Sequence, residues 1–246
     1  MILVFSIFPT MRNYENRHWF DVVGPFDFYA YLLQHDSFLP LLLPLAASLP
    51  FTMAFSGELS NRFIVYTRIR RSIRSTLVRR FSMNALVTFL VFMVVGVVPQ
   101  LFVVFGEKRY DTEGYGLTTH EQIETARLAS KTFSQLLPYG AWVPVVAYSV
   151  YLGLTAALYA TITMCSVVVS PNRVLGFSIP WIAYIMASFV MAVLWLEAYS
   201  VALAFPFRLQ QLPLLNLVFP LIGLLSVSAL AVAATISAAP RLHQLQ

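Results

Sequence analysis

Long apolar stretches alternate with short charged segments along the chain. Five windows of more than 20 residues contain no Asp, Glu, Lys or Arg, namely Ser37–Gly57, Phe81–Gly106, Thr132–Asn172, Val174–Leu196 and Leu209–Pro240. A spanning helix needs roughly 20 apolar residues at 1.5 Å each, so every window is long enough to cross a bilayer. Residues 87–98 are apolar on every side, which favours helices over the alternating strands of a membrane barrel.

The composition supports a membrane location. Of the 246 residues, 59% are hydrophobic and 11% are charged, whereas roughly a quarter of a soluble domain is charged. We therefore predict an all-α integral membrane protein, a polytopic helix bundle of about six spans in a single domain, residues 1–246. The predicted spans are residues 1–9, 37–57, 81–106, 141–169, 174–197 and 212–237.

The first predicted span is short. Residues 1–9 are apolar but cover only about 13 Å, less than half of a hydrocarbon core. They also lack the basic residues that open a secretory signal. We interpret them as the outer end of a span whose beginning is missing.

The distribution of charge predicts the orientation. Residues 57–80 hold seven of the sixteen basic residues and one acid, and cytoplasmic loops collect Lys and Arg. We therefore expect residues 57–80 and the C-terminus on the cytoplasmic side of the cell membrane, and residues 10–36 and 107–136 outside. The net charge of +5 follows from this topology, and nucleic acid need not be invoked.

A short surface helix is predicted before the third window. Thr118 precedes Glu121 by three residues, as in a capping box. Such a helix would account for the excess length of the third window.

Motifs for chemistry are missing from the sequence. There is no GxxxxGK[ST] loop for ATP, and residues 120–124 (HEQIE) have glutamate where a zinc helix needs its second histidine. The one cysteine, Cys165, permits no disulfide framework. No histidine, aspartate or lysine lies within the long windows to activate a nucleophile. We expect no enzymatic activity, catalytic residue, metal or cofactor in this chain.

The basic segment predicts an amphipathic helix. From Glu58 onward, helical spacing places Ile69, Ile73 and Leu77 on one face, and Ser56 can cap the start. A basic amphipathic helix on an anionic inner leaflet would explain the arginines. It would not explain Glu58, which the same surface repels.

The order of features here resembles a known family. An apolar span with prolines (Leu39–Phe51) is followed by FSGELSNR, then by Tyr66 and Arg68, and then by a basic run that leads into another span. This order is similar to that of ATP-binding-cassette permeases of the type-two exporter class. In that family, the acid at the end of the second span opens a cytoplasmic coupling helix that docks on a separate ATPase subunit.

The resemblance implies a role and a set of partners. The residues that it assigns to ATPase coupling are Glu58, Ser60, Asn61, Arg62, Tyr66, Arg68 and Arg71. The partners would be two ATPase subunits, which hold ATP and Mg, and a second permease, identical or related. The cargo would be amphiphilic, such as a peptide, lipid or drug. The chain departs from the family at its N-terminus, where the amphipathic entry helix and a complete first span are absent.

Candidate gate or pathway residues lie in the spans. Pro44 and Pro50 lie in the second span, and Pro180 and Pro220 in the last two. Each removes a backbone hydrogen bond and can kink its helix, which suits a gate but is also common in ordinary membrane bundles. Glu197 either binds a cationic substrate or is an interfacial residue among Trp and Tyr side chains.

Two other classes of protein stay open. A free-standing secondary transporter would need coupling charges buried at mid-membrane, and the apolar windows contain none. A non-transporting scaffold or immunity protein would be held to membrane lipids by its basic amphipathic helix. Co-purification with an ATPase would distinguish the exporter from both.

Overall fold

The described residues form helices only. The computed structural model describes residues 38–60, 73–107, 133–140, 142–170, 172–196, 199–200 and 214–238. The helices are α3 (Phe38–Ser60), α5 (Ile73–Glu107), the 3-10 helix η1 (Ser134–Tyr139), α7 (Trp142–Val169), α8 (Arg173–Val193) and α10 (Leu214–Ala238). Within these ranges the predicted helical class is confirmed.

Four helices are candidate membrane spans. By length and composition, the segments Ser75–Leu101, Trp142–Val169, Val174–Val193 and Leu217–Ala238 can each cross a bilayer. They indicate a multi-pass membrane protein. The helix α3 has 23 residues and covers the range of the second predicted span. The partial first span, residues 1–9, lies outside the described residues, so the count of six spans stays a prediction.

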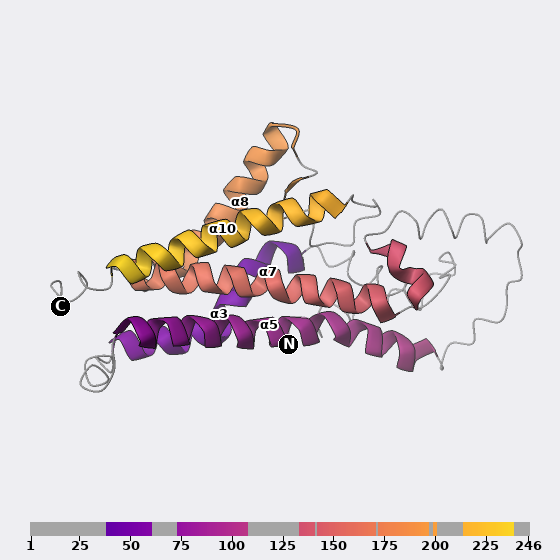
Figure 1. The fold of residues 1–246 in the computed structure, drawn as a ribbon, viewed down its shortest axis with the longest axis horizontal. Coiled ribbons are helices and arrows are strands. Elements are labelled where there is room, and N and C mark those ends of the chain that lie inside the picture. The colour runs from indigo at the N-terminus through magenta and orange to yellow at the C-terminus, as the bar shows by residue number, and fades with distance from the viewer. Residues whose placement is uncertain are drawn as a thin grey trace, which may run out of the picture.

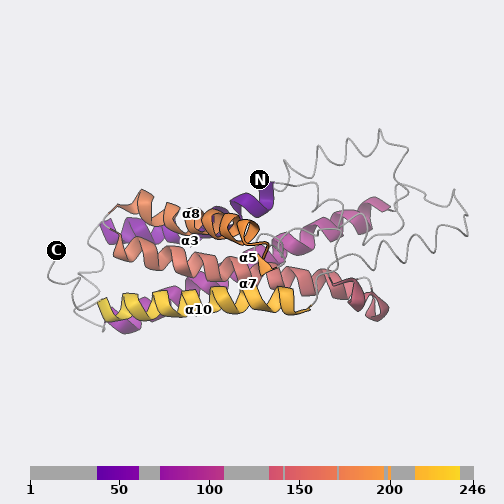
Figure 2. The same cartoon turned by 90° about the horizontal axis from the view of Figure 1, so that it is seen from above.

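The helix α7 is the centre of the bundle. It packs against α3, α5, α8 and α10. Figures 1 and 2 show that α5 runs antiparallel to α7 and that α10 runs parallel to it. The buried share of its spanning window is 61%, against 28% for α5 and 17% for α8 and α10. The other spans therefore present most of their side chains outward and use α7 as their common partner.

The most extensive helix contact among the described residues is between α5 and α7. A Cβ placed on Gly96 would lie 2.6 Å from Oγ of Ser149, and one on Gly153 would lie 2.8 Å from the carbonyl oxygen of Phe89. The two backbones approach closely at both points because glycine has no side chain there. About two turns further along α7, the amide nitrogen Nδ2 of Asn84 donates a hydrogen bond of 3.1 Å to the carbonyl of Ala160. These contacts fix an antiparallel register.

The long third window is divided at Gly140. Its φ of +118° lies in a region that favours glycine, and it separates η1 from α7. The excess length of the window thus includes about two turns of 3-10 helix ahead of the span. The surface helix predicted to begin near Thr118 and to lead into this window falls on residues before Phe133, which lie outside the described residues.

A tight turn joins α7 to α8. The side chain of Asn172 accepts a hydrogen bond of 3.0 Å from the backbone N–H of Val174, which caps α8. A Cβ on Gly176 would lie 2.8 Å from Cα of Val167, so the two helices touch directly behind the turn. The pair forms an antiparallel hairpin.

The two ends of the bundle differ in chemistry. The end of α3, the start of α5, the α7–α8 turn and the end of α10 lie together on the left of Figure 1 and of Figure 2. Arg79 and Arg80 lie near this end, which we call the arginine end. At the other end, called the aromatic end, Tyr139 and Trp142 are exposed. Aromatic side chains of this kind gather at membrane interfaces.

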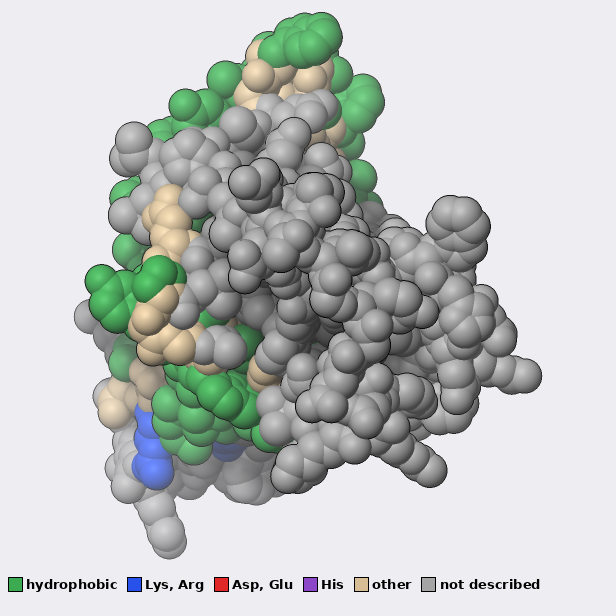
Figure 3. Space-filling view, turned by 90° about the vertical axis from the view of Figure 1, so that its right-hand side faces the viewer, with side chains coloured by type: hydrophobic (Ala, Val, Ile, Leu, Met, Phe, Trp, Pro, Cys, Tyr) green, Lys and Arg blue, Asp and Glu red, His purple; other side chains and the backbone are tan. Residues whose placement is uncertain are grey.

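The distance between the two ends matches a bilayer. By the α5–α7 register, Trp142 lies level with about Leu101, which follows Arg80 by 21 residues, or about 32 Å at the helical rise. A hydrocarbon core is roughly 30 Å thick. In the end view of Figure 3 the coloured side chains are mainly hydrophobic, and the charged colour among them is that of Lys and Arg.

Candidate functional site

The predicted start of the coupling helix is wrong in one respect. We expected a new helix to begin at Ser56, with Glu58 in its first turn. Instead α3 continues through Ser60, so Glu58 belongs to its last turn. In a continuous α-helix the amides near Ser56 already bond to carbonyls four residues earlier, and no new helix start needs a cap.

The remaining coupling residues lie outside the described residues. These are Asn61, Arg62, Tyr66, Arg68 and Arg71, all within residues 61–72. Of Glu58 and Ser60, only the helical backbone is described. The assignment of this segment to an ATPase partner therefore stays a prediction.

The helices on either side of this segment are anchored in a packed core. The base cluster, as we call it, joins α3, α5 and α7 through Phe55, Leu77, Phe81, Met164 and Cys165. The exposed fraction of each of its side chains is 6% or less. Leu77, which we expected on the apolar face of a surface helix, is thus buried inside the bundle. Residues 61–72 connect two helices that are both held by this cluster.

The predicted gate residues do not come together in the described part of the chain. Pro44 is buried in α3, which remains one helix across its prolines. Pro50 also lies in α3, and its side chain is not described. Glu197 lies outside the described residues, just beyond the end of α8 at Val193.

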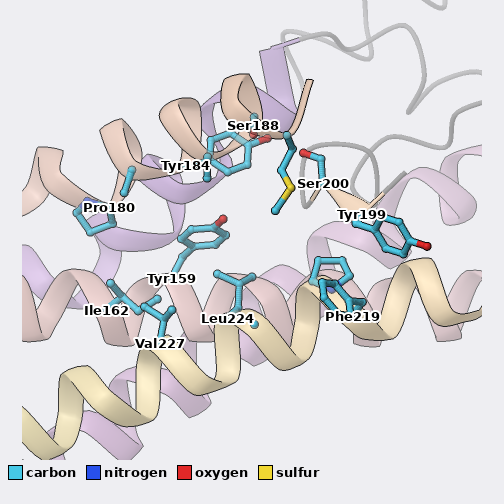
Figure 4. Close-up of a pocket in the computed structure, with 15 residues that line it drawn as sticks. Tyr159, Ile162, Pro180, Tyr184, Ser188, Tyr199, Ser200, Phe219, Leu224 and Val227 are labelled. Atoms are coloured by element: carbon cyan, nitrogen blue, oxygen red, sulfur yellow. The ribbon is translucent and has the colours of Figure 1, made fainter. Parts of the chain in front are cut away.

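A pocket of about 350 Å³ lies between α7, α8 and α10. Figure 1 shows α8 leaning away from α10 toward its C-terminal end, and Figure 4 shows side chains from all three helices around the space between them. The lining residues are Tyr159 and Ile162 of α7; Pro180, Ala183, Tyr184, Ala187, Ser188 and Met191 of α8; Phe219, Pro220, Gly223, Leu224 and Val227 of α10; and Tyr199 and Ser200 between α8 and α10. These side chains are mainly apolar, with a few hydroxyl groups.

Aromatic contacts brace the pocket at two levels. Tyr159 and Tyr184 meet edge to face, with ring centroids 5.8 Å apart, and so connect α7 with α8. Tyr199 and Phe219 meet in the same manner at 5.4 Å, at the end of the pocket away from the base cluster. Such pairs stabilise a fixed ring geometry beyond the area that they bury. Both ends of the pocket are therefore defined by rings.

Sequence reasoning did not find the pocket. The sequence feature closest to it was the presence of a proline in each of the last two spans, Pro180 and Pro220. Both prolines are buried in the wall of the pocket. Each proline frees a carbonyl in the preceding turn and loosens its helix there. Which helices would face each other across the prolines could not be read from the apolar pattern, because both spans are hydrophobic on all sides.

Several buried polar oxygens lack a hydrogen-bond partner among the described residues. They are Oγ1 of Thr52 in α3, and Oδ1 of Asn84, Oγ1 of Thr88 and Oε1 of Gln100 in α5. By contrast, Thr155 and Thr163 in α7 donate to carbonyls four residues earlier, at 2.7 and 2.9 Å. The buried polar side chains of α5 thus form a stripe that α7 satisfies only in part.

Comparisons with known proteins give no relative for this chain. No family model matches it, no curated protein matches it, and no solved structure matches it. Among the described residues, no group of His, Cys, Asp or Glu side chains could hold a metal ion. The described features define the class only broadly, as a multi-pass helical membrane protein with an apolar pocket among its last three described helices.

Proposed function

We propose that the chain is the membrane-spanning permease subunit of an ATP-binding-cassette exporter. Two separate ATPase subunits would bind ATP and Mg, and a second permease, identical or related, would complete the transporter. The substrate would be amphiphilic. The pocket between α7, α8 and α10 is the observation that supports transport, and the order of residues from Glu58 to Arg71 is the observation that supports an ATPase partner.

The pocket has properties that suit an amphiphilic molecule. Its volume of about 350 Å³ falls in the range of small-molecule sites, which are mostly apolar with a few placed polar groups. It lies between α8 and α10, whose spanning windows are only 17% buried. A substrate dissolved in the bilayer would reach it sideways, without crossing an aqueous channel.

A packed route joins the coupling segment to the pocket. Tyr159 and Ile162 line the pocket, and Met164 and Cys165 of the same helix belong to the base cluster less than two turns away. On α10, Val227 lines the pocket, while residues 231 and 232 pack against the base cluster. A displacement of the ends of α3 and α5 by a docked ATPase would therefore be passed on to two walls of the pocket.

The proposed orientation gives a direction. The arginine end would face the cytoplasm of the cell, together with the C-terminal end of α10, because basic residues collect on that side. The pocket would then lie in the cytoplasmic half of the bundle, because its lining residues Tyr159 and Ile162 are close to the level of Arg80. A pocket in this half would take up its substrate from the cytoplasmic side, as export requires.

A charge-reversal experiment tests the ATPase partnership. We expect the tagged wild-type chain, solubilised in mild detergent, to co-purify with an ATPase subunit. Glu58→Arg should lower the recovered ATPase by about tenfold, which corresponds to about 1.4 kcal/mol of binding free energy. Glu107→Arg is the matched control, since it reverses a charge at the opposite end of the same membrane domain and should leave recovery unchanged.

Three results would contradict the proposal. One is that both reversals leave the recovered ATPase unchanged. Another is that the purified chain, reconstituted alone, moves amphiphiles without nucleotide, which would favour a free-standing secondary transporter. Recovery of the chain without any ATPase and without transport would favour a scaffold held to lipids by its basic segment.

A further inference from the structure

We infer that the pocket binds one hydrocarbon chain of a phospholipid, with the head group at the arginine end and the end of the chain beside Met191 and Phe219, near the middle of the bilayer. Such a lipid belongs to the leaflet at the arginine end, which the proposed orientation makes the cytoplasmic one. As an assignment of substrate class, this inference rests on the proposed function. As an assignment of a binding site, it rests only on the geometry of the pocket.

One end of the pocket lies near the level of the arginine end. The hydrogen bond from Asn84 of α5 reaches Ala160 of α7. Arg80 precedes Asn84 by one turn and, because the two helices are antiparallel, lies level with about Met164. Ile162, a lining residue, precedes Met164 by two residues, or about 3 Å along α7. This end of the pocket is therefore at the depth where the head groups of that leaflet begin.

The wall that α8 supplies reaches the same depth. Gly176 of α8 lies against Val167 of α7. Tyr184, about two turns further along α8, meets Tyr159, about two turns earlier in α7. Pro180, midway between Gly176 and Tyr184, therefore lies level with about residue 163 of α7. The helices α7 and α8 thus place this end of the pocket at one level.

The other end of the pocket lies near the middle of the bundle. Tyr151 of α7 donates a hydrogen bond of 3.2 Å to the carbonyl of Leu217, so Phe219, two residues further along the parallel helix α10, lies level with about residue 153. The α7–α8 register places Met191 at about the same level. Halfway between the two ends of the bundle, Leu90 of α5 lies opposite about residue 153 as well. The pocket therefore ends near the bilayer midplane.

The depth of the pocket matches one leaflet. On α8 the lining runs from Pro180 to Met191, eleven residues or about 16 Å along the helix. On α10 it runs from Phe219 to Val227, or about 12 Å. Half of a hydrocarbon core is about 15 Å. The chain of a lipid whose head group lies at the arginine end would therefore end where the pocket ends.

The lining chemistry suits the chain and excludes the head group. The described lining residues include no charged side chain, so the interior of the pocket would not solvate a charged head group. At the mid-bundle end Ser200 is buried and already has a partner, and Figure 4 shows the hydroxyl of Tyr199 turned away from the space between the helices. Burial of a hydrocarbon chain along the apolar walls would supply the binding free energy.

The polar end of the lipid would meet polar residues of the protein. From Pro180, α8 extends seven residues, or about 10 Å, toward the arginine end, where it begins at Arg173. The adjoining α7–α8 turn contains Ser170 and Asn172. A head group at this end would lie beside the turn. At the opposite end of the pocket it would lie in the centre of the bilayer, where no water solvates it.

The size of the pocket argues against a protein occupant. A helix with its side chains is about 10 Å wide, so a segment as long as the pocket would fill about 1,200 Å³. The pocket measures about 350 Å³. A helix from a second copy of the chain would therefore not fit between α8 and α10, whereas a single hydrocarbon chain is much thinner.

Two small lining residues allow the pocket to be filled by mutation. A Cβ placed on Gly223 would meet no atom within 4 Å, so Gly223→Leu should fill the space without displacing neighbouring backbone. Ala183→Leu should fill it from α8, since Ala183 also lines the pocket. Ala229→Leu is the matched control, because Ala229 is exposed on α10 and is not a lining residue.

Photolabelling tests the inference on the purified full chain in phosphatidylcholine nanodiscs. One probe is phosphatidylcholine with a diazirine at the end of an acyl chain, and the other carries the diazirine on its head group. The tail probe should label the lining residues Ser188, Pro220 and Leu224, and the head probe should label residues 170–174 but not 187–191. Each of the two filling variants should lower tail labelling of these lining residues by about tenfold, and Ala229→Leu should not change it.

The outward face of α5 supplies an internal reference. Leu90, Val91 and Val94 are exposed and lie near the same depth as the mid-bundle end of the pocket, so the tail probe in the surrounding lipid should label them. Their labelling should be the same in the wild-type chain and in all variants. Unchanged labelling at these residues also shows that a filling variant has kept the bundle intact.

Three outcomes would overturn the inference. Tail labelling of the lining residues that survives both filling variants would mean that the probe reports ordinary surrounding lipid. Labelling of residues 187–191 by the head probe would mean that the bound molecule has the opposite orientation. No tail labelling of the lining residues in the wild-type chain would mean that lipid does not enter the pocket. None of these outcomes affects the ATPase test, since no ATPase is present, and loss of the ATPase partnership would leave the labelling unchanged.

Discussion

At the scale of single residues, the buried polar groups of α5 need a physical account. A buried hydroxyl without a partner costs about 1–3 kcal/mol, whereas a bonded one is close to neutral or stabilising. The hydroxyl of Thr88 in α5 has no hydrogen-bond partner among the described residues, whereas the hydroxyl of Thr155 in α7 donates to a carbonyl. The same residue type in two neighbouring helices should therefore respond oppositely to removal of its hydroxyl group.

Valine substitutions test this difference. Thr88→Val should leave the protein as stable or make it more stable, by up to about 1 kcal/mol, because an unpaired oxygen is removed. Thr155→Val should lower stability by about 1 kcal/mol, since a hydrogen bond of 2.7 Å to the carbonyl of Tyr151 is lost. Unfolding of the two variants in the same detergent, followed by circular dichroism, measures both. Marked destabilisation by Thr88→Val would show that its hydroxyl has a bonding partner.

A cross-helix hydrogen bond gives a second residue-scale prediction. Asn84→Leu removes the bond from Nδ2 to the carbonyl of Ala160, which joins α5 to α7. Such bonds in membrane bundles are worth about 0.6 kcal/mol on average and at most about 1.7. We expect a loss of stability in this range by the same unfolding assay. An unchanged unfolding curve would mean that the unpaired Oδ1 offsets the bond.

At the scale of helices, packing depends on where the backbones touch. Gly153 faces the backbone of Phe89, and Gly223 faces open space in the pocket. Both are glycines in apolar spans, and both sequence contexts are alike. The difference between them comes entirely from the neighbouring helix.

Alanine at the two glycines should separate the two environments. Gly153→Ala should lower stability by about 1–3 kcal/mol, because its Cβ would lie 2.8 Å from the carbonyl oxygen of Phe89 and force α5 and α7 apart. Gly223→Ala should be neutral or stabilising, since alanine favours a helix by up to about 1 kcal/mol and meets no neighbour. Thermal unfolding measures the difference, and equal effects would contradict the close α5–α7 contact.

The helices themselves were largely predictable, and their junctions were less so. Each apolar window matches most of one long described helix, because an uncharged run of this length has few alternatives to a helix in a membrane. The helix α5 begins at Ile73, eight residues before its window. The division at Gly140 and the continuation of α3 past Ser56 were not predicted. Both depend on local backbone geometry, which hydrophobicity does not encode. The pocket was missed for a related reason, since it depends on which faces of α8 and α10 meet.

At the scale of the whole molecule, the two ends define how the bundle lies in a membrane. Arginines mark one end and exposed aromatic rings mark the other, about one bilayer core apart. The segments that the charge pattern assigned to the cytoplasm adjoin the same end of the bundle. Chemical labelling shows which side of the membrane these segments face.

Cysteine labelling tests the orientation in intact cells. In a Cys165→Ala background, Tyr139→Cys at the aromatic end should react with a membrane-impermeant maleimide added outside. Ser170→Cys in the α7–α8 turn should react only after the membrane is permeabilised. Val190→Cys, on the outward face of α8, should stay unlabelled in both cases, because a thiol in hydrocarbon is shielded from a charged reagent.

The labelling result has clear alternatives. Reaction of Ser170→Cys before permeabilisation would invert the proposed orientation, and with it the assignment of residues 57–80 to a cytoplasmic partner. Reaction of Val190→Cys under both conditions would mean that α8 does not lie in the bilayer.

The central position of α7 has a consequence for biosynthesis. The helices α3 and α5 leave the ribosome before their shared partner, and 34 residues lie between the end of α5 at Glu107 and the start of α7 at Trp142. At about 5–20 residues per second, translation leaves α5 without that partner for about 2–7 seconds. During this interval Asn84 cannot reach Ala160, so the newly inserted α5 must rely on the translocon or on lipid head groups to shelter its polar stripe.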